Sequence, residues 1–109
     1  MIFTESLINF RSKVIAVDID GTICSEERTF DRPLAKPLDG AVEAIKLLKS
    51  NGNTIIFWTA RGWEQYNVTK HWLDTHGFIY DQILMGKPQV SIIIDDRARQ
   101  FKSWSELDV

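Results

Sequence analysis

Residues 13–22 read Lys-Val-Ile-Ala-Val-Asp-Ile-Asp-Gly-Thr, and this stretch decides the fold. A continuous apolar run, rich in β-branched side chains, leads into Asp18. Such a run predicts a short strand that is buried on both faces, as the strands of parallel sheets are. Two carboxylates, a glycine and a threonine follow at the end of this strand, where a tight turn can direct backbone N–H groups toward an anion.

Strands and helices are expected to alternate along the rest of the chain. Apolar runs predict further strands over residues 54–58 and 91–94, with a shorter run over residues 82–85. Helical spacing of apolar residues predicts helices between Asp39 and Gly52, from Trp63 to His76 and from Arg97 to Val109. This alternation predicts a Rossmann-like α/β fold, a three-layer α/β/α sandwich around a short, mainly parallel sheet.

The 109 residues are expected to form a single domain over residues 1–109, with residues 1–12 as an N-terminal edge segment and residues 22–37 as a flap or loop. The interval between the first strand and residue 55 contains one helix and about 20 further residues, which is too few for a cap domain. A single cysteine excludes a disulfide framework and a multi-cysteine zinc site.

Charge and hydropathy restrict the partners. The net charge of −2 argues against nucleic acid as a partner. The sequence contains no apolar run of membrane-spanning length and no basic leader followed by an apolar region. These features predict a cytoplasmic protein that does not bind a membrane.

Four aspartates follow two of the predicted strands: Asp18, Asp20, Asp95 and Asp96. Ligands of parallel α/β sheets bind at the carboxyl ends of the strands, so these carboxylates converge if the two strands are neighbours. Such a cluster repels itself unless a cation or protons offset the charge. Oxygen ligands favour a hard cation, and Mg²⁺ usually binds through one or two carboxylates plus a substrate phosphate. The pattern therefore predicts Mg²⁺ and phosphoryl chemistry.

Groups suited to binding a phosphate lie near the same strand ends. They are Gly21 and Thr22 after the first strand, Thr59, Ala60 and Arg61 after the second, and Lys87 before the last. A carboxylate can be the nucleophile in phosphoryl transfer and form an aspartyl-phosphate. A second carboxylate two residues further on can protonate the leaving oxygen and later activate water.

The order of these residues resembles the haloacid dehalogenase superfamily of phosphohydrolases. Asp18-Ile19-Asp20-Gly21-Thr22 resembles the first motif of that superfamily, and Thr59 resembles the second. Lys87, in Gly86-Lys87-Pro88, resembles the third motif, and Ile92-Ile93-Ile94-Asp95-Asp96 resembles the fourth. The strings Thr59-Ala60-Arg61 and Ile94-Asp95-Asp96-Arg97-Ala98 also resemble small capless phosphatases associated with capsule and polysaccharide biosynthesis.

The resemblance implies an enzyme that hydrolyses the phosphomonoester of a small molecule, either a sugar phosphate or a glycan-biosynthesis intermediate. Asp18 would be the nucleophile and a Mg²⁺ ligand, and Asp20 the general acid/base with its backbone carbonyl on the metal. Thr59 and Lys87 would hold and neutralise the phosphoryl group. Asp95 would ligate Mg²⁺, and Asp96 would act through the metal or its waters.

Three alternatives stay open. Asp95-Asp96-Arg97 also resembles the phosphatase domain of polynucleotide kinase-phosphatases, which would make the chain a nucleic-acid end phosphatase. The chain could also be a catalytically weak binding domain that keeps the fold. The same residues permit a phosphotransferase or mutase.

The connection before the last predicted strand is short. Only residues 88–90 separate Lys87 from Ser91, and at about 3.5 Å per residue they can barely cross a sheet. If Lys87 does not reach the phosphate, Arg61 or Arg97 could supply positive charge. An edge strand left uncovered would favour a homo-oligomer.

Overall fold

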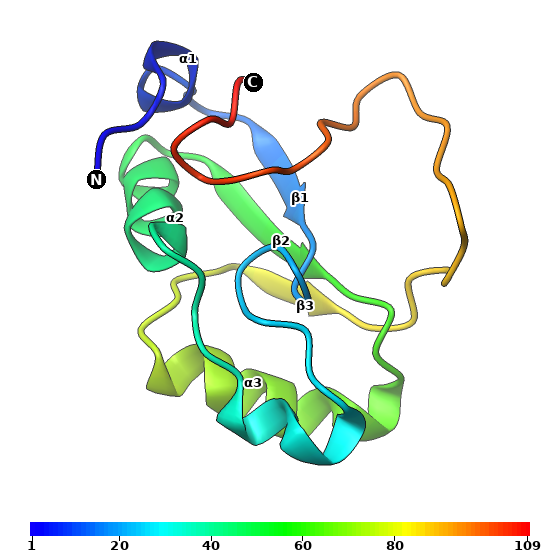
Figure 1. Ribbon diagram of the computed structural model, residues 1–109. Helices are drawn as coiled ribbons and strands as arrows, with labels where there is room; N and C mark the ends of the chain where they lie inside the picture. Colours follow the sequence, from blue (N-terminus) through cyan, green and yellow to red (C-terminus); the bar gives the residue numbers. More distant parts are fainter.

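Three short parallel strands form the sheet of the computed structural model, which describes all residues from 1 to 109 (Figure 1). They are β1 (Val14–Val17), β2 (Thr54–Trp58) and β3 (Gln82–Leu84), in the spatial order β1-β2-β3. Val17 of β1 lies opposite Phe57 of β2, which lies opposite Ile83 of β3. The strands predicted around residues 13–17, 54–58 and 82–85 are thus confirmed.

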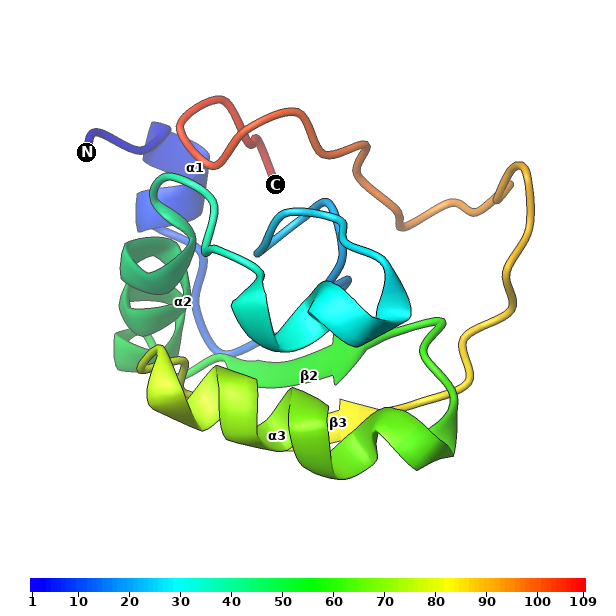
Figure 2. The same ribbon diagram turned by 60° about the horizontal axis from the view of Figure 1, so that its bottom comes forward.

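Two helices connect the strands and cover one face of the sheet (Figure 2). They are α2 (Ala41–Ser50) and α3 (Tyr66–Thr75), and a 3₁₀ turn, η2 (Trp63–Gln65), precedes α3. Crossovers between parallel strands are right-handed, and both crossovers move the chain in the same direction across the sheet. Both helices therefore lie on the same side. The predicted Rossmann-like α/β arrangement with a parallel sheet is confirmed, whereas the third layer of the predicted α/β/α sandwich is not formed.

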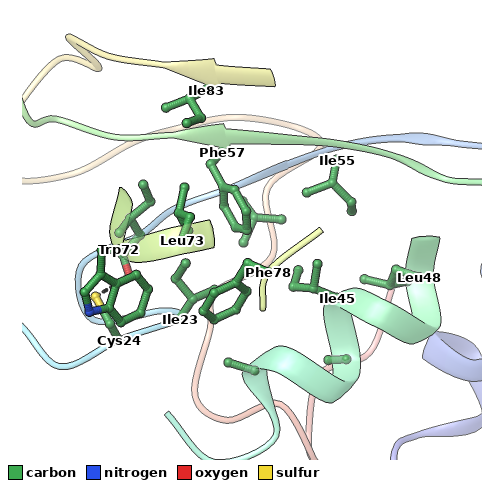
Figure 3. Packing of buried hydrophobic residues seen from close by; sticks show 14 of the residues in the cluster. Ile23, Cys24, Ile45, Leu48, Ile55, Phe57, Trp72, Leu73, Phe78 and Ile83 are labelled. Atoms are coloured by element: carbon green, nitrogen blue, oxygen red, sulfur yellow. Dashed lines mark hydrogen bonds between the residues drawn. The ribbon is translucent and has the colours of Figure 1, made fainter. Parts of the chain in front are cut away.

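The core lies between this face of the sheet and the two helices (Figure 3). Ile55 and Phe57 of β2 are fully buried and point toward the helices. The Phe57 ring meets the Phe78 ring edge-on, with 5.9 Å between centroids. The Trp72 indole donates from Nε1 to the carbonyl oxygen of Ala35 at 2.8 Å, so this large ring is buried with its one donor satisfied.

The opposite face of the sheet is not covered by a helix. Val14 and Trp58 point to this side because they alternate with the buried residues of β1 and β2. Val14 is 71% exposed and Trp58 38% exposed. No crossover carries the chain from β3 past β1, and such a crossover would place a helix on this face.

The strand predicted over residues 91–94 is not formed. Residues 86–100 extend away from the sheet (Figure 1), and the side chain of Ile94 is 92% exposed. The amide of Lys87 donates to the carbonyl oxygen of Thr59 at 2.8 Å, which fixes the start of this segment at the end of β2. Four extended residues span at most about 14 Å, whereas the start of a strand beside β1 lies roughly 16 Å away. The predicted strand was wrong because the apolar pattern of residues 91–94 carries no information about the length of the connection that precedes it.

The helix predicted over residues 97–109 is also absent, although this tail packs inward. Trp104 is buried and donates from Nε1 to the carbonyl oxygen of Thr22 at 2.8 Å, and Phe101 lies against it. The end of the tail binds the N-terminal segment, where Thr4 Oγ1 donates to the carbonyl oxygen of Leu107 at 2.6 Å. These long-range hydrogen bonds hold the tail in an irregular course.

The N-terminal segment contains one short helix, α1 (Glu5–Ile8), which packs against α2 through the buried side chain of Leu7. Residues 22–37 form a flap that carries a 3₁₀ helix, η1 (Thr29–Leu34), and contacts α3. The amide of Ser25 donates to the carbonyl oxygen of Lys36 at 2.9 Å and closes the base of the flap. None of the helices is long and apolar enough to cross a membrane.

Candidate active site

The loops that follow the three strands lie side by side at one end of the sheet. Thr59 N donates to the carbonyl oxygen of Leu84 at 3.0 Å, and Gly86 N donates to that of Arg61 at 2.9 Å. Together with the bond from Lys87 N to Thr59, these contacts continue the pairing of β2 and β3 beyond the strands. The backbone therefore holds Lys87 next to Thr59, although the two are far apart in the sequence.

Asp18 is the most accessible carboxylate at the strand ends. Its Oδ2 accepts a hydrogen bond from Thr22 Oγ1 at 3.2 Å, and its Oδ1 lies 3.7 Å from Lys87 Nζ. The Asp18 side chain is 36% exposed, so its oxygens remain accessible. Lys87 Nζ also lies 5.1 Å from the centre of the Trp58 ring, a distance typical of a cation–π contact. Despite the short connection after it, Lys87 reaches the carboxylate predicted to be the nucleophile.

Asp20 and Arg61 form a bidentate ion pair. Arg61 Nε donates to Asp20 Oδ2 at 2.9 Å, and a terminal nitrogen donates to Oδ1 at 2.7 Å. The other terminal nitrogen donates to Thr69 Oγ1 on α3 at 2.9 Å, and the Arg61 side chain is only 2% exposed. The guanidinium is thus occupied by protein partners and orients Asp20, whereas it was predicted to bind phosphate.

Thr69 was not identified from the sequence. It lies on the buried side of α3, on the face that also carries Trp72 and Leu73. Its position on an otherwise apolar helix face could have identified Thr69 from the sequence, because a buried hydroxyl requires a hydrogen-bond partner.

Cys24 lies behind Asp20, with 3.9 Å between Sγ and Asp20 Oδ1. Burial, reinforced by the charge of Asp20, raises the pKa of the Cys24 thiol to about 12. The thiol is therefore protonated at neutral pH and is not suited to be a nucleophile.

The turn after Asp20 uses its own backbone donors. Gly21, at φ +81°, donates its amide to the carbonyl oxygen of Cys24 at 2.9 Å, and Thr22 N donates to that of Ile19 at 3.0 Å. In this arrangement the amides serve the turn, and the Thr22 hydroxyl binds Asp18. Thr59 is buried, and its Oγ1 accepts from the Arg61 amide at 3.1 Å.

A cleft of about 330 Å³ opens over these strand ends. Its floor contains Asp18, Asp20, Ala60, Arg61 and Lys87. The flap forms one wall, and the extended segment after Lys87 forms the other; these walls contribute Glu26, Glu27, Arg32, Pro88, Gln89, Val90 and Ile93. The cleft is therefore lined mainly by charged and polar groups of both signs.

Asp95 and Asp96 do not line the cleft. Both are exposed on the extended segment, and Asp95 Oδ1 accepts from the amide of Arg97 at 2.6 Å. No group of three or more His, Cys, Asp or Glu side chains is arranged to hold a metal ion. The structure thus brings Asp18, Asp20, Thr59, Arg61 and Lys87 together and leaves the predicted second pair of carboxylates outside.

The donor chemistry at the strand ends suits a hard cation in part. Asp18 offers accessible carboxylate oxygens, and Mg²⁺ needs only one or two carboxylates when waters and a substrate phosphate supply the rest. The carboxylate of Asp20 is engaged by Arg61. At the strand ends, Asp18 is therefore the one aspartate whose carboxylate is accessible and not held by a guanidinium.

No protein-family model and no curated protein matches the sequence. Among solved structures, two chains from Pnkp1/Rnl/Hen1 complexes, one described as an RNA repair complex, share the fold, each with a TM-score of 0.61. They are 20% and 18% identical to this chain over 69% and 83% of its length, and the match covers 26% and 31% of their own length.

A crystal structure of an MCSG target from Vibrio cholerae is more similar. It aligns with a TM-score of 0.70 and 30% identity, over 81% of this chain and 83% of that chain. The chain therefore belongs to the same family as this Vibrio cholerae protein.

Proposed function

We propose that the protein is a Mg²⁺-dependent phosphomonoester hydrolase of the haloacid dehalogenase type, acting on a sugar phosphate or a glycan-biosynthesis intermediate. The observation that carries the proposal is the pair of Asp18 and Lys87. An accessible carboxylate faces an ammonium group at 3.7 Å on the floor of a polar cleft. Phosphoryl transfer needs little more than a positioned nucleophile and positive charge around the transferred group.

In the proposed reaction, Asp18 attacks phosphorus in line with the leaving oxygen. A bond forms between a carboxylate oxygen and phosphorus, the bond to the substrate alcohol breaks, and protonated Asp20 gives that alcohol its proton. Asp20 then takes a proton from water, which attacks phosphorus and releases inorganic phosphate and Asp18. Lys87 neutralises charge on the phosphoryl oxygens.

The ion pair with Arg61 bears on the role of Asp20. Both carboxylate oxygens of Asp20 accept hydrogen bonds from the guanidinium. We infer that substrate binding weakens the contact between Asp20 and Arg61, and that Arg61 orients Asp20 for the second step.

Mg²⁺ would be held by the carboxylate of Asp18 and by the backbone carbonyl of Asp20, and it would supply charge neutralisation of the phosphoryl group. Asp95 and Asp96 would join only if residues 88–100 move toward the cleft. The apolar side chains of this segment are exposed, and burying them would favour that movement. Hydrogen exchange with and without Mg²⁺ tests this step. Slower exchange at residues 91–94 is expected, and unchanged exchange with Mg²⁺ bound would limit the ligands to the floor of the cleft.

The first test is phosphate release from a panel of phosphomonoesters with and without Mg²⁺. Asp18→Asn is expected to abolish turnover, because the amide is a poor nucleophile. Asp39→Asn is a matched control, since Asp39 is exposed and does not line the cleft. Turnover that survives in Asp18→Asn would contradict the proposed role of Asp18.

A nucleic-acid end phosphatase is the second candidate. It is favoured by the shared fold of the two chains from Pnkp1/Rnl/Hen1 complexes, one of them described as an RNA repair complex. The net charge of −2 argues against it. Phosphate release from 3′- and 5′-phosphorylated oligonucleotides, compared with sugar phosphates over a range of salt concentrations, separates the two. Transfer of the phosphoryl group without release of free phosphate would indicate a phosphotransferase. Binding of Mg²⁺ without any turnover would indicate a binding domain.

A further inference from the structure

Arg32 places an unpaired cation on the flap wall of the cleft. It belongs to η1, is partly buried and lines the same cleft as Asp18 and Lys87. Its Nε is buried and has no hydrogen-bond partner, and no carboxylate lies within ion-pair distance of its side chain. A buried donor without an acceptor is costly, so the guanidinium of Arg32 is available to an acceptor that enters the cleft.

The other cations near the cleft are already occupied. Arg61 binds Asp20 and Thr69, and Lys87 faces Asp18 at the strand ends. On the flap itself, Arg28 is paired with Asp31 at 3.0 Å. Among the cations that line the cleft, Arg32 is thus the one that remains available, and it lies on the wall rather than on the floor where the phosphoryl group would react.

Two carboxylates share the flap wall with Arg32. Glu26 and Glu27 also line the cleft, and Glu26 Oε2 comes within 3.9 Å of the position that a Cβ on Gly21 would take. Carboxylates repel an anion but accept hydrogen bonds from hydroxyl groups. This wall therefore suits a polyhydroxylated ligand that carries one further anionic group, placed against Arg32.

We propose that Arg32 selects phosphomonoesters whose alcohol carries a second anionic group, a carboxylate or a phosphate. This inference rests on the proposed function, because it assigns the reacting phosphoryl group to Lys87 and Asp18. The planar guanidinium can bind an oxyanion through two parallel hydrogen bonds, which favours such a substrate over its neutral counterpart. Arg32 is a specificity residue and does not take part in the transfer itself.

Glucose 1-phosphate and glucuronic acid 1-phosphate form a matched pair of probes, because they differ only in a hydroxymethyl group and a carboxylate at one carbon. Wild-type kcat/KM is expected to be roughly 10- to 100-fold higher for the glucuronic acid ester, the factor that one charged hydrogen bond supplies. Arg32→Gln is expected to remove this preference and to leave glucose 1-phosphate unaffected. Glucose 1,6-bisphosphate is the third probe, and its kcat/KM shows whether Arg32 prefers a phosphate or a carboxylate as the second anionic group.

Arg28→Gln is the control on the same flap, since Arg28 is exposed and paired outside the cleft. It is expected to keep the wild-type preference. An equal fall in kcat/KM for both esters in Arg32→Gln, or equal kcat/KM for both esters in the wild type, would overturn the inference.

If the wild type hydrolyses neither ester, the proposed hydrolase activity fails. The affinities of the two esters, measured by calorimetry, then test whether Arg32 binds the second anionic group. Tighter binding of the glucuronic acid ester that is lost in Arg32→Gln supports the inference. Equal binding of the two esters refutes it.

Discussion

Removing the carboxylate of Asp20 is expected to destabilise the fold, whatever the activity of the protein. The Asp20→Ala variant leaves the Arg61 guanidinium, 2% exposed, with Thr69 as its only side-chain partner. Breaking a buried ion pair by removing one partner typically costs about 3–5 kcal/mol. Because the Asp20 side chain keeps 19% exposure and water can enter the vacated space, we expect the lower end, about 3 kcal/mol.

Urea unfolding followed by tryptophan fluorescence measures this change. With a slope of about 1.5 kcal/mol/M, a loss of about 3 kcal/mol lowers the midpoint by about 2 M. The Asp31→Ala variant removes the partner of the exposed Arg28 and is the control, for which little change is expected.

A double variant isolates the cause. Replacing both partners with apolar residues, Asp20→Leu with Arg61→Met, removes the buried charge together with its counter-charge and is expected to be more stable than Asp20→Leu alone. If Asp20→Ala costs no more than Asp31→Ala, or if the double variant loses the sum of the two single losses, the interpretation of the pair as a buried, mutually dependent unit is wrong.

Three further predictions concern the frame around the site. The pKa of Cys24 is raised to about 12, against 9.0 for a free thiol, which predicts slow alkylation of the folded chain at mildly alkaline pH, measured by mass spectrometry. It also predicts that the free energy of unfolding falls as pH rises above 9.0, measured by urea titrations. The hydrogen bond from Lys49 holds the pKa of Asp81 below 3.8. The ionised carboxylate therefore stabilises the fold above that pH, and this contribution is lost as pH falls through the lowered value. Asp81→Asn should be less stable than the wild type in urea unfolding at neutral pH, and the difference in stability should disappear in strong acid. Trp104→Phe removes the donor to the Thr22 carbonyl at 2.8 Å and should cost about 1–2 kcal/mol in urea unfolding; an unchanged midpoint would mean that the tail does not support the turn.

Local patterns in the sequence were enough to predict the elements that place the strand ends. The apolar run before Asp18 and the run over residues 54–58 form strands because their β-branched and aromatic side chains fit a pleated surface with one buried face. The spacing of Ala41, Ile45 and Leu48 likewise defines the buried side of α2. Since parallel strands end at the same side of a sheet, the proximity of Asp18 to Lys87 also follows from the order of these elements.

Only the tertiary structure decided which charged groups pair. Arg61 lies 41 residues from Asp20, and nothing local to either residue predicts that the guanidinium binds this carboxylate and Thr69 instead of a phosphate. Arg32 likewise becomes notable only when the flap brings it to the wall of the cleft. Pair formation between charges depends on distance and burial, and both are properties of the folded chain.

The segment over residues 91–94 marks the limit of local prediction. Its isoleucines have the composition of a buried strand, yet a strand forms only where a free edge lies within reach of the chain. The hydrogen bond between Lys87 and Thr59 shortens that reach, so the segment stays exposed and Asp95 and Asp96 stay with it. The sequence by itself thus determined the strands, helices and residue types of the site, whereas long-range hydrogen bonds and chain length decided which of those residues meet.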